Sequence, residues 1–192
     1  MSILFNNSFD KLPDNFYSKI EPEKTKEYKK ILINNSLCKD LGIDFNYLNS
    51  EEGLQILSGN HTPENASPLA MVYAGHQFGN WVPQLGDGRA VLLGELLDKK
   101  KQRFDFQLKG SGKTPYSRGG DGKAWLGPVI REYIVSEYMN KINIPTTRSL
   151  AAMYTGEDVY REKVYPGAVL CRVAKGHIRV GTFQYFLSLI HI

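Results

Sequence analysis

Two short runs near the middle of the chain have hydrophobic residues at the spacing of β-strands. Residues 90–97 form an apolar run of strand length, and in residues 104–109 hydrophobic and polar residues alternate strictly. Because only the polar stretch 98–102 separates the two runs, we expect them to pair as antiparallel strands. The alternation places Lys109 on the polar face of its strand, opposite the aromatic residues that face the core.

A helix is predicted over residues 126–142, where apolar residues recur at the i, i+3, i+4 and i+7 spacing. Glu132 lies off this apolar stripe. Further strands are predicted at 148–154 and 168–174. The stripe expected to face the core consists of Leu126, Val129, Ile130, Tyr133, Ile134 and Tyr138.

The first part of the chain, residues 1–70, is predicted to form short polar helices separated by turns. One helix is expected over 36–41 and another over 50–57, each closed by a glycine. We therefore expect a helical amino-terminal extension over 1–70, followed by a nucleotide-binding lobe over 71–192. The predicted fold class is α+β, with an antiparallel sheet and a helix that packs on it.

The composition is that of an ordinary globular protein, with 192 residues, 42% hydrophobic and 23% charged. The net charge of +4 comes from scattered basic residues, which argues against a nucleic-acid-binding function. The two cysteines, Cys38 and Cys171, provide neither a disulfide framework nor a four-ligand zinc site. With no signal-peptide pattern and no run of about 18 apolar residues, we expect a cytoplasmic protein that does not enter membranes.

Glycine and basic residues gather in three segments, 85–89, 108–112 and 117–122. Glycine lets backbone N–H groups approach phosphate oxygens, and lysine and arginine add charge-assisted hydrogen bonds. This combination indicates a site for a nucleotide. Lys109 ends a predicted strand, and Glu132 follows 23 residues later (132 minus 109) on a predicted helix. A strand lysine paired with a helix glutamate is typical of a protein-kinase amino lobe.

Other interpretations of these residues remain open at this point. The Gly-Asp-Gly sequence at 86–88 also suits a plain tight turn, and Lys109 and Glu132 could both be exposed to solvent. Residues 110–114 end like a P-loop, although Gln107 stands where that motif needs glycine and Pro115 interrupts its helix. A non-catalytic nucleotide-binding module is the third alternative. His76 and His177 are more typical of structural histidines bonded to backbone than of metal ligands.

Five segments resemble the selenoprotein O family, namely 73–79, 83–90, 114–118, 144–148 and 177–183. The resemblance implies a kinase-like fold, described as a pseudokinase, that transfers AMP from ATP to serine, threonine or tyrosine hydroxyls of target proteins. It also implies Mg²⁺ as a cofactor and Glu132 as the partner of Lys109. The ATP contacts that it implies are Gly86, Gly88, Arg89, Lys109, Asp121, Gly122, Arg172 and Arg179.

Family members continue beyond the position of Ile192, the last residue of this chain, into a carboxyl lobe that supplies the catalytic base and the magnesium ligands. We therefore expect neither a catalytic residue nor a metal ligand in this chain, and we interpret it as an amino-terminal fragment. The four cations Arg89, Lys109, Arg172 and Arg179 are expected to converge on one cleft. One aspartate cannot neutralise them, so the cleft should be strongly positive and suited to a polyphosphate.

Overall fold

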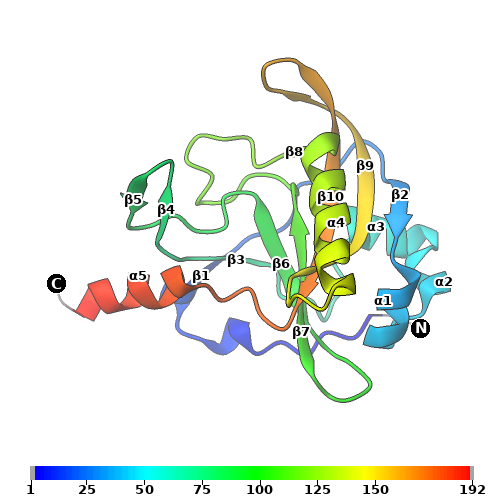
Figure 1. Cartoon of the computed structure of the whole chain (residues 1–192), viewed down its shortest axis with the longest axis horizontal. Coiled ribbons are helices and arrows are strands. Elements are labelled where there is room, and N and C mark those ends of the chain that lie inside the picture. Colours follow the sequence, from blue (N-terminus) through cyan, green and yellow to red (C-terminus); the bar gives the residue numbers. More distant parts are fainter. Residues whose placement is uncertain (1–2, 191–192) are drawn as a thin grey trace.

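The computed structural model describes residues 3–190 and has an α+β fold built on a large antiparallel sheet (Figure 1). The strands of this sheet are β1 (Tyr17–Lys19), β2 (Lys29–Ile33), β3 (Leu69–Met71), β6 (Ala90–Leu97), β7 (Arg103–Lys109), β8 (Ala124–Trp125), β9 (Arg148–Tyr160) and β10 (Val164–Ala174). Their order is β1-β3-β6-β7-β10-β9-β2, and β8 pairs with β10. A separate hairpin joins β4 (Gly75–Gln77) to β5 (Asn80–Val82).

The helices in the described part of the chain are α1 (Asn35–Leu41), α2 (Phe45–Leu48), α3 (Glu51–Ser58), α4 (Leu126–Lys141) and α5 (Val180–Ile190). Two short 3-10 turns, Phe9–Lys11 and Asp14–Phe16, precede them. The two helices predicted in the first 70 residues are α1 and α3. Asn34 and Ser50 cap their amino ends, and Gly42 and Gly59 close them in the left-handed conformation. None of these helices combines the length and the apolar character needed to cross a membrane.

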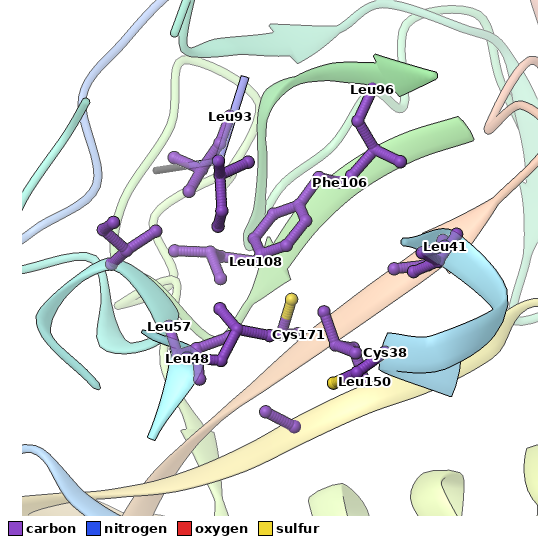
Figure 2. Close-up of a cluster of buried hydrophobic side chains, with 14 of the residues drawn as sticks. Cys38, Leu41, Leu48, Leu57, Leu93, Leu96, Phe106, Leu108, Leu150 and Cys171 are labelled. Carbon is purple, nitrogen blue, oxygen red and sulfur yellow. The ribbon is translucent and has the colours of Figure 1, made fainter. Parts of the chain in front are cut away.

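The helices cover the two faces of the sheet. On one face α1, α2 and α3 pack with Phe106 and Leu108 of β7, which confirms the predicted inward direction of these side chains (Figure 2). On the other face α4 packs through Val129 against Ala152 of β9 and Leu170 of β10. Because side chains alternate across a strand, Lys109 and Leu108 point to opposite faces. The sheet therefore separates the main core from the face that carries Lys109.

The main core contains both cysteines, each fully buried and unpaired (Figure 2). Burial raises the pKa of the Cys38 thiol to about 11 and raises the pKa of Cys171 as well. A thiol with a raised pKa is a poor nucleophile. The prediction that Cys171 is packed within its strand is thus confirmed.

Residues 1–70 are not only helical, because they also supply β1, β2 and most of β3 to the sheet. The edge strand β2 pairs with β9, and β1 pairs with β3. The prediction of a helical extension missed these strands because they are short and because β2 begins with two lysines, Lys29 and Lys30. Lysine is common on edge strands, where it discourages pairing with other molecules. The sheet takes strands from both sides of residue 70.

The predicted apolar stripe of α4 is wrong at its carboxyl end, where Ile134 and Tyr138 are 59% and 63% exposed. Glu137 instead faces the sheet and accepts two hydrogen bonds from the Arg148 guanidinium, at 2.9 and 2.8 Å, and one from the Ser149 N–H at 2.9 Å. These charge-assisted bonds are stronger than neutral ones. The helix is therefore oriented by its acidic residues as well as by its hydrophobic ones.

We predict that Phe106→Ala lowers the free energy of unfolding by about 3–5 kcal/mol, because it leaves a cavity in the core. Phe106 is fully buried and packs edge-on against Phe5, with ring centroids 5.7 Å apart. Urea unfolding followed by circular dichroism measures the change. The matched control is Phe183→Ala, since Phe183 is 70% exposed and its loss should cost less than about 0.5 kcal/mol. Equal effects of the two substitutions would contradict the assignment of the core.

Candidate nucleotide-binding site

One cavity of about 600 Å³ brings together residues that lie far apart in the sequence. It opens between the loop before β6, the end of β7, the loop 117–123, β10 and the segment that precedes α5. All eight of the predicted ATP contacts line it: Gly86, Gly88, Arg89, Lys109, Asp121, Gly122, Arg172 and Arg179. The predicted convergence is therefore confirmed, whereas binding of ATP by these residues stays a prediction.

The pairing of strands explains why the basic residues meet. In the antiparallel register Lys109 lies opposite Ala90 on one side and opposite Leu170 on the other. The residue before Ala90 is Arg89, whose carbonyl accepts a hydrogen bond of 2.8 Å from the Gly110 N–H. Arg172 lies two residues beyond Leu170, on the same face of the sheet. The register thus brings together three cations from the residue before β6, from the end of β7 and from β10.

Glu132 of α4 lies between two of these cations. One of its oxygens is 2.5 Å from Lys109 Nζ, and the other is 3.1 Å from Nη1 of Arg172. The predicted pairing of a strand lysine with a helix glutamate is confirmed. Burial alone would raise the pKa of Glu132, but Arg172 and Lys109 outweigh it and hold that pKa below its usual value. Burial and the charge of Arg172 lower the pKa of Lys109.

A buried hydrogen-bond network continues from Arg172 beneath the cavity. The Arg172 guanidinium donates to the Gln107 carbonyl, and the Gln107 amide donates to Asp87 at 3.2 Å. Asp87 also accepts a hydrogen bond of 3.1 Å from the hydroxyl of Tyr73. Arg172 is thereby fixed from two sides, by this network and by Glu132. Arg172 is buried, since only 8% of the residue is accessible.

Sequence analysis missed Asp87 and Gln107. Asp87 lies within a Gly-Asp-Gly sequence interpreted as a loop, and Gln107 is a polar member of an alternating strand for which solvent exposure is the ordinary expectation. In the structure Asp87 is 3% exposed and Gln107 is fully buried. Burial raises the pKa of Asp87, while Arg179 and Arg172 oppose that shift. The Arg179 guanidinium lies 4.9 Å from the centre of the Tyr73 ring, at cation–π distance.

The charge balance of the cavity is positive, although the set of charges differs from the expected four cations and one aspartate. Seven basic side chains line it: Arg89, Lys109, Arg118, Lys123, Arg161, Arg172 and Arg179. Two acidic side chains, Asp87 and Asp121, also line it, and Glu132 adds a third charge behind Lys109. An excess of cations in a concave site attracts polyanions.

Asp121 is engaged by an arginine that sequence analysis did not single out. Arg161, in the turn between β9 and β10, donates to both carboxylate oxygens of Asp121 at 2.7 and 2.8 Å. Asp121 also accepts the N–H of Lys123 at 2.9 Å. The hydrogen bonds from Arg161 are the main reason why the pKa of Asp121 lies below its usual value. No local sequence signal could have found Arg161, because a charged residue in a hairpin turn normally lies in solvent.

The glycines of the cavity allow close packing of the backbone. Gly122 has φ +67°, and a Cβ there would lie 1.9 Å from the carbonyl oxygen of Gly112. The N–H groups of Gly86 and Gly88 donate to the Tyr73 and Gly86 carbonyls at 3.0 and 3.1 Å. These two N–H groups therefore have backbone partners, and nucleotide contact at Gly86 and Gly88 stays a prediction.

The P-loop alternative is not favoured. Residues 110–114 are not followed by a helix, since the next helix in the chain is α4. The Lys113 N–H donates to the Glu23 carboxylate at 3.0 Å, and the Thr114 hydroxyl donates to the Asp87 carbonyl at 2.7 Å. A P-loop needs its amides and hydroxyl directed at phosphate and magnesium.

The two histidines have different surroundings. The ring of His177 is buried and lies 3.0 Å from the Asp105 carboxylate, so the expected hydrogen bond to backbone is replaced by one to a side chain. His76 is exposed, and its ring lies 5.0 Å from that of Trp81. Within residues 3–190 no group of three acidic, histidine or cysteine side chains is arranged to hold a metal ion.

The position of the catalytic base is a prediction that the structure does not test. The base of the family is expected beyond Ile192, and Ile192 itself lies outside the described residues, which end at Ile190. The placement of the base beyond Ile192 therefore stays a prediction.

An antiparallel α+β lobe with a cationic cavity and a strand lysine held by a helix glutamate defines a candidate phosphate-transfer protein. The family model described as Protein adenylyltransferase SelO matches residues 1–191. The chain belongs to this family, which confirms the resemblance found in the sequence.

Curated relatives similar to the chain include proteins called Protein nucleotidyltransferase YdiU. One from Rhodopseudomonas palustris strain BisB18 is 59% identical over 184 residues, which are 96% of this chain and 38% of the relative. One from Nitrobacter hamburgensis is 58% identical over 186 residues, which are 97% of this chain and 37% of the relative. One from Bradyrhizobium sp. strain ORS 278 is 60% identical over 184 residues. The chain therefore spans less than two fifths of the length of these relatives.

We predict that Glu132→Gln lowers the free energy of unfolding by about 1–3 kcal/mol near neutral pH, because it leaves Lys109 and Arg172 without their shared anion. The pKa of Glu132 is lowered in the folded state, so its stabilisation is complete above the ordinary value of 4.5 and is lost as the pH falls through the lowered value. The wild-type and variant stabilities should therefore converge in acid.

Denaturant unfolding at several pH values tests this prediction. The raised pKa of Asp87 acts in the opposite sense, but it is common to both proteins and cancels in their difference. The control is Glu64→Gln, which removes an exposed carboxylate away from the cavity and should leave stability unchanged. A difference between wild type and Glu132→Gln that does not depend on pH would contradict an ionised Glu132.

Proposed function

We propose that this chain is the nucleotide-binding lobe of a protein adenylyltransferase with a kinase-like fold. In this proposal the substrate is ATP, and AMP passes to a serine, threonine or tyrosine hydroxyl of a target protein. The observation that carries the proposal is the single cavity lined by all eight predicted ATP contacts, with Lys109 held by Glu132. Membership of the SelO family supports it. The expected setting is the cytoplasm.

The basic side chains of the cavity would hold the triphosphate. Arg89 and Arg179 are exposed at the cavity, and Arg172 and Lys109 are held more deeply by Glu132. During transfer the acceptor hydroxyl oxygen forms a bond to the α-phosphorus, and the bond from that phosphorus to the bridging oxygen breaks. Pyrophosphate leaves with additional negative charge. Fixed cations stabilise this charge best because they need no rearrangement during the reaction.

The basic side chains of the cavity can neither remove the proton of the acceptor hydroxyl nor coordinate a metal ion, so other groups must do so. The acids at the cavity are committed to cations or to the buried network, as Asp121 is to Arg161 and Glu132 is to Lys109. They do not fit a magnesium site. We therefore assign the magnesium ligands and the general base to the part of the relatives that this chain does not span. When bound, Mg²⁺ would neutralise phosphate charge.

We predict that the chain binds ATP and that Arg179→Ala and Arg89→Ala each weaken binding by about 1.5–3 kcal/mol, the value of a charge-assisted hydrogen bond. Titration calorimetry at increasing salt should show affinity falling, because the contacts are screened charge pairs. These arginines are better probes than Arg172, whose loss would also disturb Glu132. The control is Lys100→Ala, which removes a cation from the turn at the far end of the β6–β7 hairpin. Unchanged ATP affinity in both arginine variants would exclude this cavity as the nucleotide site.

A transfer assay separates an enzyme from a non-catalytic nucleotide-binding module. With ATP labelled on the α-phosphate, we expect this chain alone to transfer no label to a protein acceptor, because the described acids at the cavity are all engaged and none is free to act as base. A longer form that includes the remainder found in the relatives should transfer it, and Lys109→Ala in that form should not. Label transferred by this chain above its own Lys109→Ala control would contradict the assignment of the base.

A further inference from the structure

The turn between β9 and β10 reaches across to the loop that carries Asp121. Figure 1 shows this hairpin projecting beyond the rest of the sheet on the side where β8 lies. Its turn carries Arg161, which donates to Asp121 and, at 3.1 Å, to the Lys123 carbonyl. A second ion pair of 2.8 Å joins Lys123 to Glu157 of β9. Two ion pairs thus tie one edge of the cavity to the hairpin.

The first residues of β10, in the same hairpin, hold the segment that follows the loop more firmly. Trp125 of β8 pairs with Gly167 of β10 and stacks on the ring of Tyr165, with centroids 4.3 Å apart. The anchor at Gly122 is the close backbone contact with Gly112. From Gly122 onward the loop is therefore fixed by packing.

The preceding residues lack such packing. A Cβ placed on Gly119 would meet no atom within 4 Å, and one on Gly120 would meet only the Ser117 carbonyl oxygen. Arg118 has φ +51°, which is unfavourable for its residue type, and its guanidinium donates to Gln77 across the cavity. The side chain of Asp121 lies at the boundary between this open stretch and the packed one. Besides the Lys123 N–H, its hydrogen bonds within the described residues come from Arg161.

We infer that Arg161 is a positioning residue for the nucleotide site, which acts by orienting Asp121 and closing the loop 117–123 along the cavity edge. This inference rests on the proposed function. The guanidinium of Arg161 is engaged with both oxygens of Asp121, so its charge is balanced locally. The Arg161–Asp121 pair should therefore contribute geometry rather than net positive potential. A lysine could keep the charge but could not form the paired hydrogen bonds.

The expected loss of ATP affinity in Arg161→Ala depends on how exposed the Arg161–Asp121 ion pair is to solvent. The side chains of Arg161 and Asp121 are 36% and 38% exposed, and ion pairs this open to solvent contribute little unless their geometry is bidentate. We therefore expect Arg161→Ala to weaken ATP binding by about three- to tenfold, less than the loss of a cation that touches phosphate. Arg161→Lys should lose nearly as much.

Titration calorimetry with ATP on this chain provides the test, with Lys163→Ala as the matched control. Lys163 lies in the same turn and is exposed, so its loss removes the same charge without the contact to Asp121. Lys163→Ala should leave affinity within about twofold. In an Asp121→Asn background, Arg161→Ala should have little further effect. The salt dependence of ATP binding should be the same in wild type and Arg161→Lys, because the two proteins carry the same net charge at the cavity.

Hydrogen exchange without nucleotide provides a second measurement. The amides of residues 119–123 should exchange faster in Arg161→Ala than in wild type or Lys163→Ala. Unchanged affinity and exchange in both Arg161 variants would overturn the inference while leaving the proposed function intact. Additive losses with Asp121→Asn would indicate direct contact with nucleotide and would overturn the positioning role. A wild-type chain that bound no ATP would overturn the proposed function, and this inference with it.

Discussion

The carboxylate of Glu132 links helix α4 to the two strands that carry Lys109 and Arg172 at the cavity. Lys109 and Arg172 lie on adjacent strands and face the same side of the sheet, and two cations so placed repel one another unless an anion lies between them. Glu132 provides that anion from α4, at 2.5 Å from Lys109 and 3.1 Å from Arg172. The same contacts hold α4 against β7 and β10. The packing of α4 on the sheet and the placement of the two cations at the cavity therefore both depend on Glu132.

Buried polar residues behind Arg172 fix its position further. Gln107 and Asp87 are buried and continue the hydrogen bonds of Arg172 into the sheet. Burying polar groups is unfavourable unless they find partners, and Gln107 and Asp87 find theirs within this network. The network fixes the direction of the Arg172 guanidinium before any ligand arrives. Such preorganisation favours binding of an anion, because less order has to be created when it binds.

The sequence predicted the parts of this structure that depend on local pattern. The strands 90–97 and 104–109, the helix around Glu132 and the convergence of distant basic residues all follow from periodicity, spacing and family resemblance. The rotation of α4 was not predictable, because it depends on Arg148 and Arg172, which come from other strands. Arg161 was missed for the same reason, since its partner Asp121 lies 40 residues away. Contacts between charges distant in sequence leave no periodic signal.

We propose that this cavity holds the triphosphate of a nucleotide through its side-chain cations. A crystal structure of the chain with a non-hydrolysable ATP analogue tests it most directly. We expect phosphate oxygens within hydrogen-bond distance of Lys109 Nζ and of the Arg172 and Arg179 guanidinium groups, with the Lys109–Glu132 pair retained. An analogue bound with its phosphates away from these three side chains, or in another cavity of the molecule, would contradict it.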